Sequence, residues 1–371
     1  MDYKPLQRDL VVVGGGPVGA SLARAARGMS VALVAHERPA APPAEGFDAR
    51  VYALSPGNVA FLRALGAWPQ DRVVPVHAMR IFGDAAGTQL HFDAYEAGVP
   101  ELAWIVEDAQ LQQALWRDLE VVIDRIGAPS FCADGVHMAL AGGEELSARL
   151  IVGADGANSF VRAHAGIAVR ERDYGQSAIV ANFRCEKPHG NVAFQWFAGG
   201  AVLALLPLPG NHVSMVWSRP DEPAELAREV EVASRGALGQ LQLVTPARSY
   251  RLRRLAAQRM VKPRVALAGD AAHVVHPLAG QGLNLGLQDV RALARVLAER
   301  EPSRDPGDVR LLRRYERLRA EPILAMDTMI DTLFRLFGAQ HAALARVRNA
   351  GLNLTDRLPV LKNLLMRHAM A

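Results

Sequence analysis

The chain has 371 residues, half of them hydrophobic and 22% charged, which suits one large or two packed domains and argues against disorder. A net charge of +4, with no basic patch interleaved with aromatic residues, predicts that the protein does not bind nucleic acid. Two cysteines fit a reducing compartment, neither sits in a metal-binding or redox spacing, and no metal motif is present. Because no run of about 18 apolar residues occurs, no spanning helix is expected, and the default location is the cytoplasm.

The chain opens with a βαβ unit. An apolar run at 9–13 predicts a strand, GGGPVG follows at once, and residues 20–26 and 31–34 predict a helix and a second strand. The glycines of this GxGxxG fingerprint are Gly14, Gly16 and Gly19. In this context they allow a tight turn, close approach to a pyrophosphate and close helix packing, so the unit predicts dinucleotide binding.

One position departs from that fingerprint. An acidic residue usually ends the second strand and binds the adenosine ribose, but strand phase puts Ala35 there. Glu37, two residues on, is a candidate ribose ligand; the alternative is a solvated loop carboxylate. Further along, Arg50 suits neutralisation of a pyrophosphate or packing near a cofactor ring, or is a surface arginine.

The middle of the chain predicts a second layer of structure. Residues 57–65 and 111–119 have helical spacing, 73–92 alternate as strands, and the strand at 148–153 ends in a turn that carries Asp155 near the first glycine loop. Short strands with Gly and Pro between them then predict an antiparallel sheet. They cover residues 178–184, 192–197, 202–207 and 212–217.

A third stretch, RVALAGDAAHVVHPLAGQGLNLGLQDV at 264–290, is the most informative. It predicts a buried strand at 265–268, a break at Gly269 and Asp270, and a helix that begins at Gly280 and Gly282. A helix that begins at glycines presents free N–H groups and the positive end of its dipole, which favour an anion or a carbonyl taking on negative charge. The Asp270 carboxylate suits a sugar or polyol hydroxyl. After Val290 the chain is predicted to be helical to its end.

With these stretches in hand, the sequence resembles the FAD-dependent aromatic hydroxylases of the para-hydroxybenzoate hydroxylase group. GGGPVG, GADGANSFVR and GDAAHVVHPLAGQGLNLGLQD are that group's three motifs in order. Over nearly the whole chain, segments such as ARVYALSPGNVAFLRALGAW and LAWIVEDAQLQQALW resemble the ubiquinone-biosynthesis hydroxylases within it.

The resemblance implies an α/β fold: a Rossmann-like FAD-binding domain, an inserted antiparallel-sheet substrate domain and a helical C-terminal segment. The expected boundaries are 1–70, 104–168 and 258–320 for the FAD-binding domain, 71–103 and 169–257 for the substrate domain, and 321–371 for the C-terminal segment.

The resemblance also implies roles for individual residues. Asp155 supports the first loop, Asp270 holds the ribityl and pyrophosphate region, and the residues around the start of the late helix surround one edge of the isoalloxazine ring. The implied cofactor-binding set is Gly14, Gly16, Gly19, Glu37, Arg50, Gln112, Asp155, Asp270, Pro277, Gly280, Gln281, Gly282 and Asn284. His276 is the best titratable candidate near the ring, although such a histidine more often only packs the loop, and His273 is a weaker one.

The implied activity is ring hydroxylation of a polyprenylated phenol in ubiquinone biosynthesis by FAD and O₂, through a flavin C4a-hydroperoxide, with electrons from NAD(P)H or a separate reductase. The alternatives are a flavin hydroxylase of another aromatic substrate, a flavin reductase or dehydrogenase, and a non-catalytic flavoprotein that organises a quinone-biosynthesis complex. A prenyl chain needs an apolar channel, although sheet core would give the same pattern. Candidate channel residues are Phe194, Trp196, Phe197, Leu203 and Leu205.

The basic C-terminal end is compatible with peripheral contact at the inner face of the membrane or with a partner protein, and equally with a helix docked on the FAD domain. The sequence leaves the oligomeric state open. The basic residues of this end are Arg346, Arg348, Arg357, Lys362 and Arg367.

Overall fold

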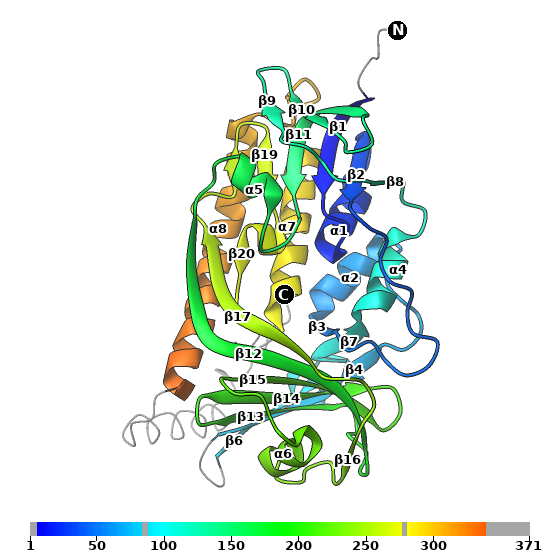
Figure 1. The fold of residues 1–371 in the computed structure, drawn as a ribbon, viewed down its shortest axis with the longest axis vertical. Helices are drawn as coiled ribbons and strands as arrows, with labels where there is room; N and C mark the ends of the chain where they lie inside the picture. The colour runs from blue at the N-terminus through cyan, green and yellow to red at the C-terminus, as the bar shows by residue number, and fades with distance from the viewer. Residues whose placement is uncertain (1–5, 84–87, 277–279, 339–371) are drawn as a thin grey trace.

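The computed structural model describes residues 6–83, 88–276 and 280–338, and side chains up to residue 332. In these ranges the chain forms three sheets, and most of its helices pack around the first sheet (Figure 1). No helix among the described residues combines the length and the apolar character that crossing a membrane requires.

The first sheet contains the opening βαβ unit. Its strands are β1 (Leu6–Val13), β2 (Val31–Ala35), β8 (Val121–Ile123), β9 (Ser130–Phe131), β10 (Val136–Ala139), β11 (Glu145–Gly153), β18 (Val261–Lys262) and β19 (Val265–Leu267). The order across the sheet is β18-β19-β11-β1-β2-β8, and the five strands from β19 to β8 are mutually parallel. The predicted strands at the N-terminus, at 148–153 and at 265–268 are therefore confirmed as neighbours, with their carboxyl ends at one edge.

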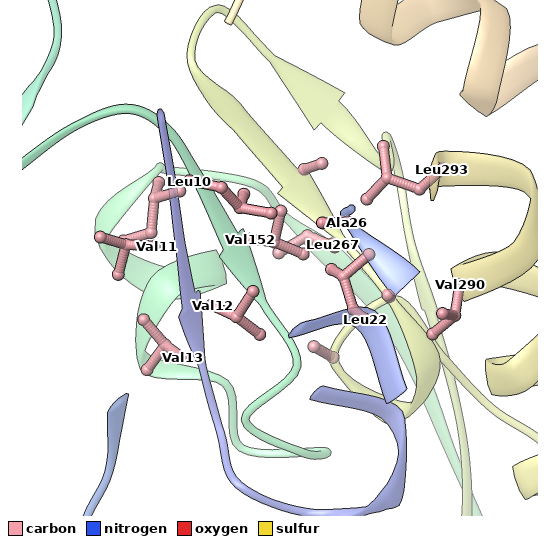
Figure 2. Packing of buried hydrophobic residues seen from close by; sticks show 14 of the residues in the cluster. Leu10, Val11, Val12, Val13, Leu22, Ala26, Val152, Leu267, Val290 and Leu293 are labelled. Carbon is pink, nitrogen blue, oxygen red and sulfur yellow. The ribbon is translucent and has the colours of Figure 1, made fainter. Parts of the chain in front are cut away.

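Most of the described helices cover this sheet, and the others pack on the second sheet. Their bounds are α1 (Pro17–Ala25), α2 (Pro56–Ala64), α3 (Ala94–Ala97), α4 (Asp108–Trp116), α5 (Phe160–His164), α6 (Leu226–Ala233), α7 (Gln281–Ala298) and α8 (Val309–Gly338), with a 3₁₀ turn, η1, at Gly269–Ala271. Figure 2 shows side chains from β1, α1, β11, β19 and α7 meeting in one apolar core. The near-continuous apolar runs of β1 and β11 follow from burial of a parallel sheet on both faces.

The second sheet is the larger one, below the first in Figure 1. Its strands are β5 (Ala78–Phe82), β6 (Gln89–Asp93), β12 (Val169–Cys185), β13 (Val192–Ala198), β14 (Ala201–Leu208), β15 (His212–Arg219), β16 (Leu241–Leu243), β17 (Arg248–Ala257) and β20 (His273–Val274). The sheet is antiparallel as expected except at one pair, because β13 runs parallel to β5. A hairpin that enters from a distant part of the chain has no tight turn to fix its direction against β13.

Two long strands connect the sheets. The β12 strand begins at Val169, nine residues before the predicted start, and both it and β17 curve from the first sheet into the second (Figure 1). The short strand β20, from the late glycine-rich stretch, pairs with β17 at Leu255 and Ala256. The third motif thus contributes a strand to the second sheet, across the predicted boundary between the cofactor and substrate regions.

A three-stranded sheet completes the fold. It consists of β3 (Val51–Leu54), β4 (Val74–Val76) and β7 (Ala103–Glu107), in the order β3-β7-β4. Its apolar side chains pack against Ala193 and Leu208 of the second sheet. The division of the chain at the predicted domain boundaries stays a prediction.

The region after α7 departs from the expected continuous helix. Residues 299–308 form turns between α7 and α8, because Pro302 and Pro306 lack the backbone N–H groups that a helix needs. Gly307 approaches the Arg149 carbonyl oxygen so closely that a Cβ would lie 2.3 Å from it. The last 33 residues, with the basic C-terminal end, lie outside the described residues. The α8 helix is held along its length by polar contacts to Met260 just before β18 and to β19, α7, β17 and β12.

Candidate active site

The first glycine loop joins β1 to α1, and its glycines differ in what surrounds them. A Cβ on Gly14 would lie 2.3 Å from the Ala154 carbonyl oxygen, and one on Gly19 would lie 1.9 Å from the Gly14 oxygen. A Cβ on Gly16 would meet nothing within 4 Å. Gly14 and Gly19 are therefore required for close packing of the chain on itself, whereas Gly16 presents bare backbone to open space, as approach to a pyrophosphate requires.

The ribose position departs from the usual arrangement as predicted. Ala35 ends β2 almost fully buried, beside Gly15 and the Trp116 indole, whose Nε1 donates to the Gly15 oxygen at 2.7 Å. Glu37 lies in the loop beyond with its side chain 76% exposed, 3.3 Å from the His36 Nε2. This placement favours the alternative of a solvated carboxylate for Glu37.

The second motif turn lies against the first loop, as expected. The Ala154 N–H donates to the Val13 oxygen, which brings the turn beneath Gly14. The Asp155 carboxylate accepts hydrogen bonds from the Ser159 hydroxyl at 2.5 Å and the Val161 N–H at 3.1 Å. Asp155 therefore shapes the turn and the start of α5 that support the loop.

Arg50 and Gln112 meet through a shared cluster. The Arg50 guanidinium lies 5.2 Å from the centre of the Tyr52 ring, and Asp108 accepts from the Tyr52 hydroxyl at 3.1 Å and from the Gln112 amide at 2.8 Å. The chief reason that the pKa of Arg50 is raised is its proximity to Tyr52, while burial opposes the rise. Asp270 adds a smaller contribution, so the arginine and the third motif lie within electrostatic reach of each other.

A buried ion pair that the sequence did not reveal anchors the segment before Arg50. Glu107 is fully buried and accepts two hydrogen bonds from Arg72, at 2.8 and 2.9 Å, and one from the Asp48 N–H at 2.7 Å. Asp48 in turn accepts from the Arg50 and Ala109 N–H groups. The signal was a glutamate closing an apolar strand, a position that requires a partner.

The third motif carries Asp270 on the η1 turn after β19. Asp270 is exposed to solvent, yet burial among surrounding protein groups raises the pKa of its carboxyl, and His273 and Arg50 oppose that rise. The carboxyl group is therefore accessible to solvent while neighbouring protein groups partly desolvate it. Gly269 has φ of +60°, and a Cβ there would press on Val18 of α1, which fixes this turn closely on the first helix.

The start of α7 is built as predicted, although one of its residues serves a different purpose. Gly280 is the N-cap with φ of +62°, Gln281 begins the helix, and a Cβ on Gly282 would meet nothing within 4 Å. Asn284 is 1% exposed, and its side chain bonds Ser55, Asn58 and Ala53. It therefore fastens α7 to the β3–α2 connection, and its contact with a cofactor stays a prediction. Pro277 lies outside the described residues.

The two histidines of the motif have different environments. His276 is fully buried, edge-on to the Tyr174 ring at 4.8 Å, and burial lowers its pKa to about 4, so it is neutral at neutral pH. That favours the packing role over general acid–base work, and its catalytic role stays a prediction. His273 forms a 2.6 Å contact to Asp289, which itself accepts from Arg319; neither partner was among the predicted residues.

The predicted channel residues divide between the two faces of the second sheet. Phe194, Trp196, Leu203 and Leu205 pack beneath α6 in the sheet's own core, which agrees with the sheet-core alternative for these four. Strand alternation explains this, because every second residue on neighbouring strands points to the same face. Phe197 points to the opposite face and packs with Val275 and Leu285 of the third-motif region.

That opposite face has an open centre. Gln195, Ala204 and Val216 lie side by side in register on β13, β14 and β15 and are only partly buried, although they stand mid-sheet. At the two ends of the same face, Phe197 and Leu208 are buried against the third-motif region and the small sheet. A surface of one amide and two apolar side chains, partly exposed between two packed ends and next to the start of α7, suits a small aromatic ligand that carries a polar group.

These features fit a dinucleotide with a redox ring. Open backbone at Gly16 and Gly282, an accessible but desolvated Asp270, and the cationic Arg50 are the groups that the described turns offer to a ligand. The carboxyl edge of a parallel sheet, where the three motif turns meet, is where ligands of such sheets bind. The arrangement fits FAD: the first loop would hold its phosphates, and the start of α7 would face its ring.

Comparison with known proteins agrees with this geometry. Residues 133–326 match the family described as FAD binding domain. The chain is 38% identical to ubiquinone hydroxylase UbiL of Rhodospirillum rubrum, over 98% of this chain and 89% of that protein. It is 36% identical to 3-demethoxyubiquinol 3-hydroxylase of Escherichia coli, over 98% of both chains.

Solved structures share the fold. A p-nitrophenol 4-monooxygenase from Pseudomonas putida aligns with a TM-score of 0.80 at 18% identity, covering 99% of each chain. A variant of Klebsiella pneumoniae HpxO in complex with FAD aligns with a TM-score of 0.77 at 19% identity, covering 97% of this chain and 99% of that one.

Fold and site together define an FAD-dependent aromatic-ring monooxygenase. Within that class, the chain belongs to the family of ubiquinone-biosynthesis hydroxylases. The resemblance seen in the sequence is thereby confirmed, as are the fold class and the cofactor FAD. The assignment of individual residues to FAD stays a prediction.

Proposed function

We propose that this protein hydroxylates the aromatic ring of a polyprenylated phenol on the route to ubiquinone. The observation that carries the proposal is the open row of Gln195, Ala204 and Val216 on the sheet face next to α7, in a chain related over its whole length to two ubiquinone hydroxylases. The row offers a largely apolar surface for the ring. FAD, when bound and reduced by NAD(P)H or a separate reductase, activates O₂ for transfer of one oxygen atom to that ring.

The protein's own part is binding, orientation and exclusion of water. Free N–H groups in the first turn of α7, together with the helix dipole, favour negative charge in front of Gly280 and Gly282. Gly14 and Gly19 keep the first loop close to the backbone behind it, so that the open backbone at Gly16, with Arg50, would hold the pyrophosphate, and Asp270 would hold hydroxyl groups of the ribityl chain. Asp155 and Asn284 act by shaping the turns that carry these groups. The buried His276 has a lowered pKa of about 4, so its ring is uncharged at neutral pH, and it lines the turn as a packing group.

The decisive experiment follows the substrate. In a strain that lacks this protein, mass spectrometry of quinone intermediates is expected to show one prenylated precursor accumulating, and the purified protein with FAD and a reductant is expected to place ¹⁸O from O₂ in the product. An unchanged quinone pool would point to a different aromatic substrate. Binding of FAD with no labelled product on any phenol would favour a flavoprotein without hydroxylase activity.

A variant pair sharpens the test at the ring site. Ala204→Phe adds a ring to the open row, and we expect at least a tenfold loss of hydroxylation with FAD affinity unchanged. Ala201→Phe, on the same strand, lies on the opposite face by strand alternation and serves as the control. Equal effects of the two variants would argue against the row as the substrate surface.

We also propose that the protein meets its substrate at the membrane surface. Support comes from the apolar character of a polyprenyl chain and from the basic C-terminal residues, which lie outside the described residues. Sedimentation with vesicles containing 30% anionic lipid is expected to carry the full chain down at low salt, about 50 mM, and to release it at about 500 mM. Equal recovery with neutral vesicles would contradict this.

A further inference from the structure

Three buried charged side chains meet behind the turn that carries Asp270. Asp289 of α7 is fully buried, and His273 and Arg319 are each 5% exposed. The Asp289 carboxylate lies 2.6 Å from the His273 Nε2 and accepts from the Arg319 Nε at 2.7 Å. No role in the predicted site accounts for so costly an arrangement, because a buried carboxylate needs its partners to offset desolvation.

The position of the bonds indicates what the network does. Asp289 Oδ2 accepts from the Gly269 N–H at 2.9 Å as well as from His273. Gly269 and His273 stand at the two ends of the short segment that contains Asp270, so one carboxylate oxygen holds both ends of the turn. The other oxygen of the Asp289 carboxylate, Oδ1, accepts from Arg319 of α8. Arg319 also donates to backbone and side-chain oxygens of α7.

The charges support the geometry. Burial by itself would lower the pKa of His273, but the Asp289 carboxylate outweighs it and the pKa is raised. Burial works in the opposite sense on Asp289, where His273 and Arg319 outweigh it and lower the pKa of the carboxyl. Asp289 is thus kept ionised and able to accept three hydrogen bonds at once, which a neutral amide in its place cannot do.

We propose that Asp289 and Arg319 are positioning residues for the cofactor turn. Asp289 fixes the backbone from Gly269 to His273 so that Asp270 faces FAD. Arg319, on α8, holds the Asp289 carboxylate in place and so connects α8 to that turn. The inference rests on the proposed placement of FAD at Asp270. It assigns a part of the helical segment after α7 to cofactor binding, although that segment contains none of the three sequence motifs.

The competing explanation is that the network only docks α8. The helix offers a matched control, because Asp327, two turns after Arg319, forms an ion pair with Arg254 of β17 that also docks α8. Among the described residues, Asp327 bonds Arg254 and forms no hydrogen bond with the 269–273 turn. Asp327→Asn therefore weakens docking while leaving the turn's own bonds in place.

The test measures FAD affinity and backbone protection in the full-length apoprotein. For Asp289→Asn we expect at least a tenfold higher Kd for FAD by flavin fluorescence titration, and faster hydrogen exchange of a peptide covering 268–274 before FAD is added. Arg319→Met should show the same two changes to a smaller degree, with partial recovery in Arg319→Lys. Asp327→Asn should show neither.

Equal losses for Asp289→Asn and Asp327→Asn, or wild-type affinity and exchange in Asp289→Asn, would overturn the proposal. If circular dichroism shows that Asp289→Asn does not fold, FAD affinity and hydrogen exchange are measured in His273→Gln and Arg319→Met instead. Weaker FAD binding with faster exchange would support the proposal, and wild-type values would overturn it. Because FAD binding is measured without substrate, failure of the hydroxylase proposal leaves this result interpretable.

Discussion

Two turns at the carboxyl edge of the first sheet reach a fixed shape by opposite means. The Gly14–Gly19 loop is fixed by the absence of side chains, since Gly14 and Gly19 approach backbone too closely for a Cβ. The Gly269–His273 turn is fixed largely by side chains, since Asp289 holds both of its ends from α7. The comparison teaches that a cofactor turn recognised by its glycines can still depend on buried charges elsewhere.

The first way to break the comparison is to add a methyl group where the first loop has no room. In Gly19→Ala the new Cβ would lie 1.9 Å from the Gly14 carbonyl oxygen, so backbone must move. We expect the apoprotein to lose about 3 kcal/mol of unfolding free energy, the upper end for overpacking, and to lose FAD binding. Urea unfolding of the apoprotein measures the first effect. An unchanged midpoint would mean that the loop is not closely packed.

The segment after the Gly269–His273 turn, which contains His276, is expected to make the free energy of unfolding depend on pH. The folded pKa of His276 is lowered to about 4 from an unfolded value of 6.5, so the folded state disfavours the charged form. Stability linked to this histidine is therefore complete above the unfolded pKa and is lost as pH falls from about 6.5 to about 4, by up to about 3 kcal/mol. Urea unfolding at steps from pH 7 to pH 4 should show this loss in the wild type relative to His276→Gln. Parallel curves for the two proteins would contradict it.

A variant at Gly16 distinguishes two roles of the first loop, which are packing against the protein and close approach of a ligand. Because a Cβ there would meet nothing within 4 Å, Gly16→Ala should leave the apoprotein's unfolding free energy within about 0.5 kcal/mol of wild type. If the pyrophosphate approaches this backbone, the FAD Kd should rise about tenfold, or about 1.4 kcal/mol. Titration of apoprotein with FAD measures this, with Gly19→Ala as the contrasting variant. Unchanged affinity would move the pyrophosphate away from Gly16.

These contrasts also mark what the sequence could predict. The βαβ unit, the three turns and their meeting at one edge follow from local patterns, because glycine spacing and apolar runs act over a few residues. Asp289 and Arg319 are 30 residues apart and the bond between Glu107 and Arg72 spans 35, so no local pattern pairs them. A signal was present all the same: Asp289 interrupts the apolar side of α7 between Leu287 and Val290, a position where a charge requires a partner.

For the candidate channel residues, the sequence could not decide between channel and sheet core, for a different reason. Alternation shows that two faces exist but not which of them is covered by a helix, and the single helix α6 decided that Phe194 and Leu203 belong to a core. Asn284 was placed correctly in the first turn of α7, yet its partners Ser55 and Ala53 lie more than 200 residues away in the sequence. Such contacts depend on the folded topology rather than on the motif.

The smallest expected effect concerns the adenosine end of the cofactor. The Glu37 side chain is 76% exposed and near His36, and Ala35 offers no polar group, so neither supplies the usual carboxylate to a ribose from this position. We expect Glu37→Ala to change the FAD Kd by less than twofold, as measured by flavin fluorescence, with Glu45→Ala as a control for loss of surface charge. A tenfold weakening in Glu37→Ala alone would show that the loop carboxylate turns inward when FAD binds. An unchanged Kd would mean that affinity at this end comes from the glycine loop and the buried surroundings of β2, which places more of the binding energy on the two turns compared above.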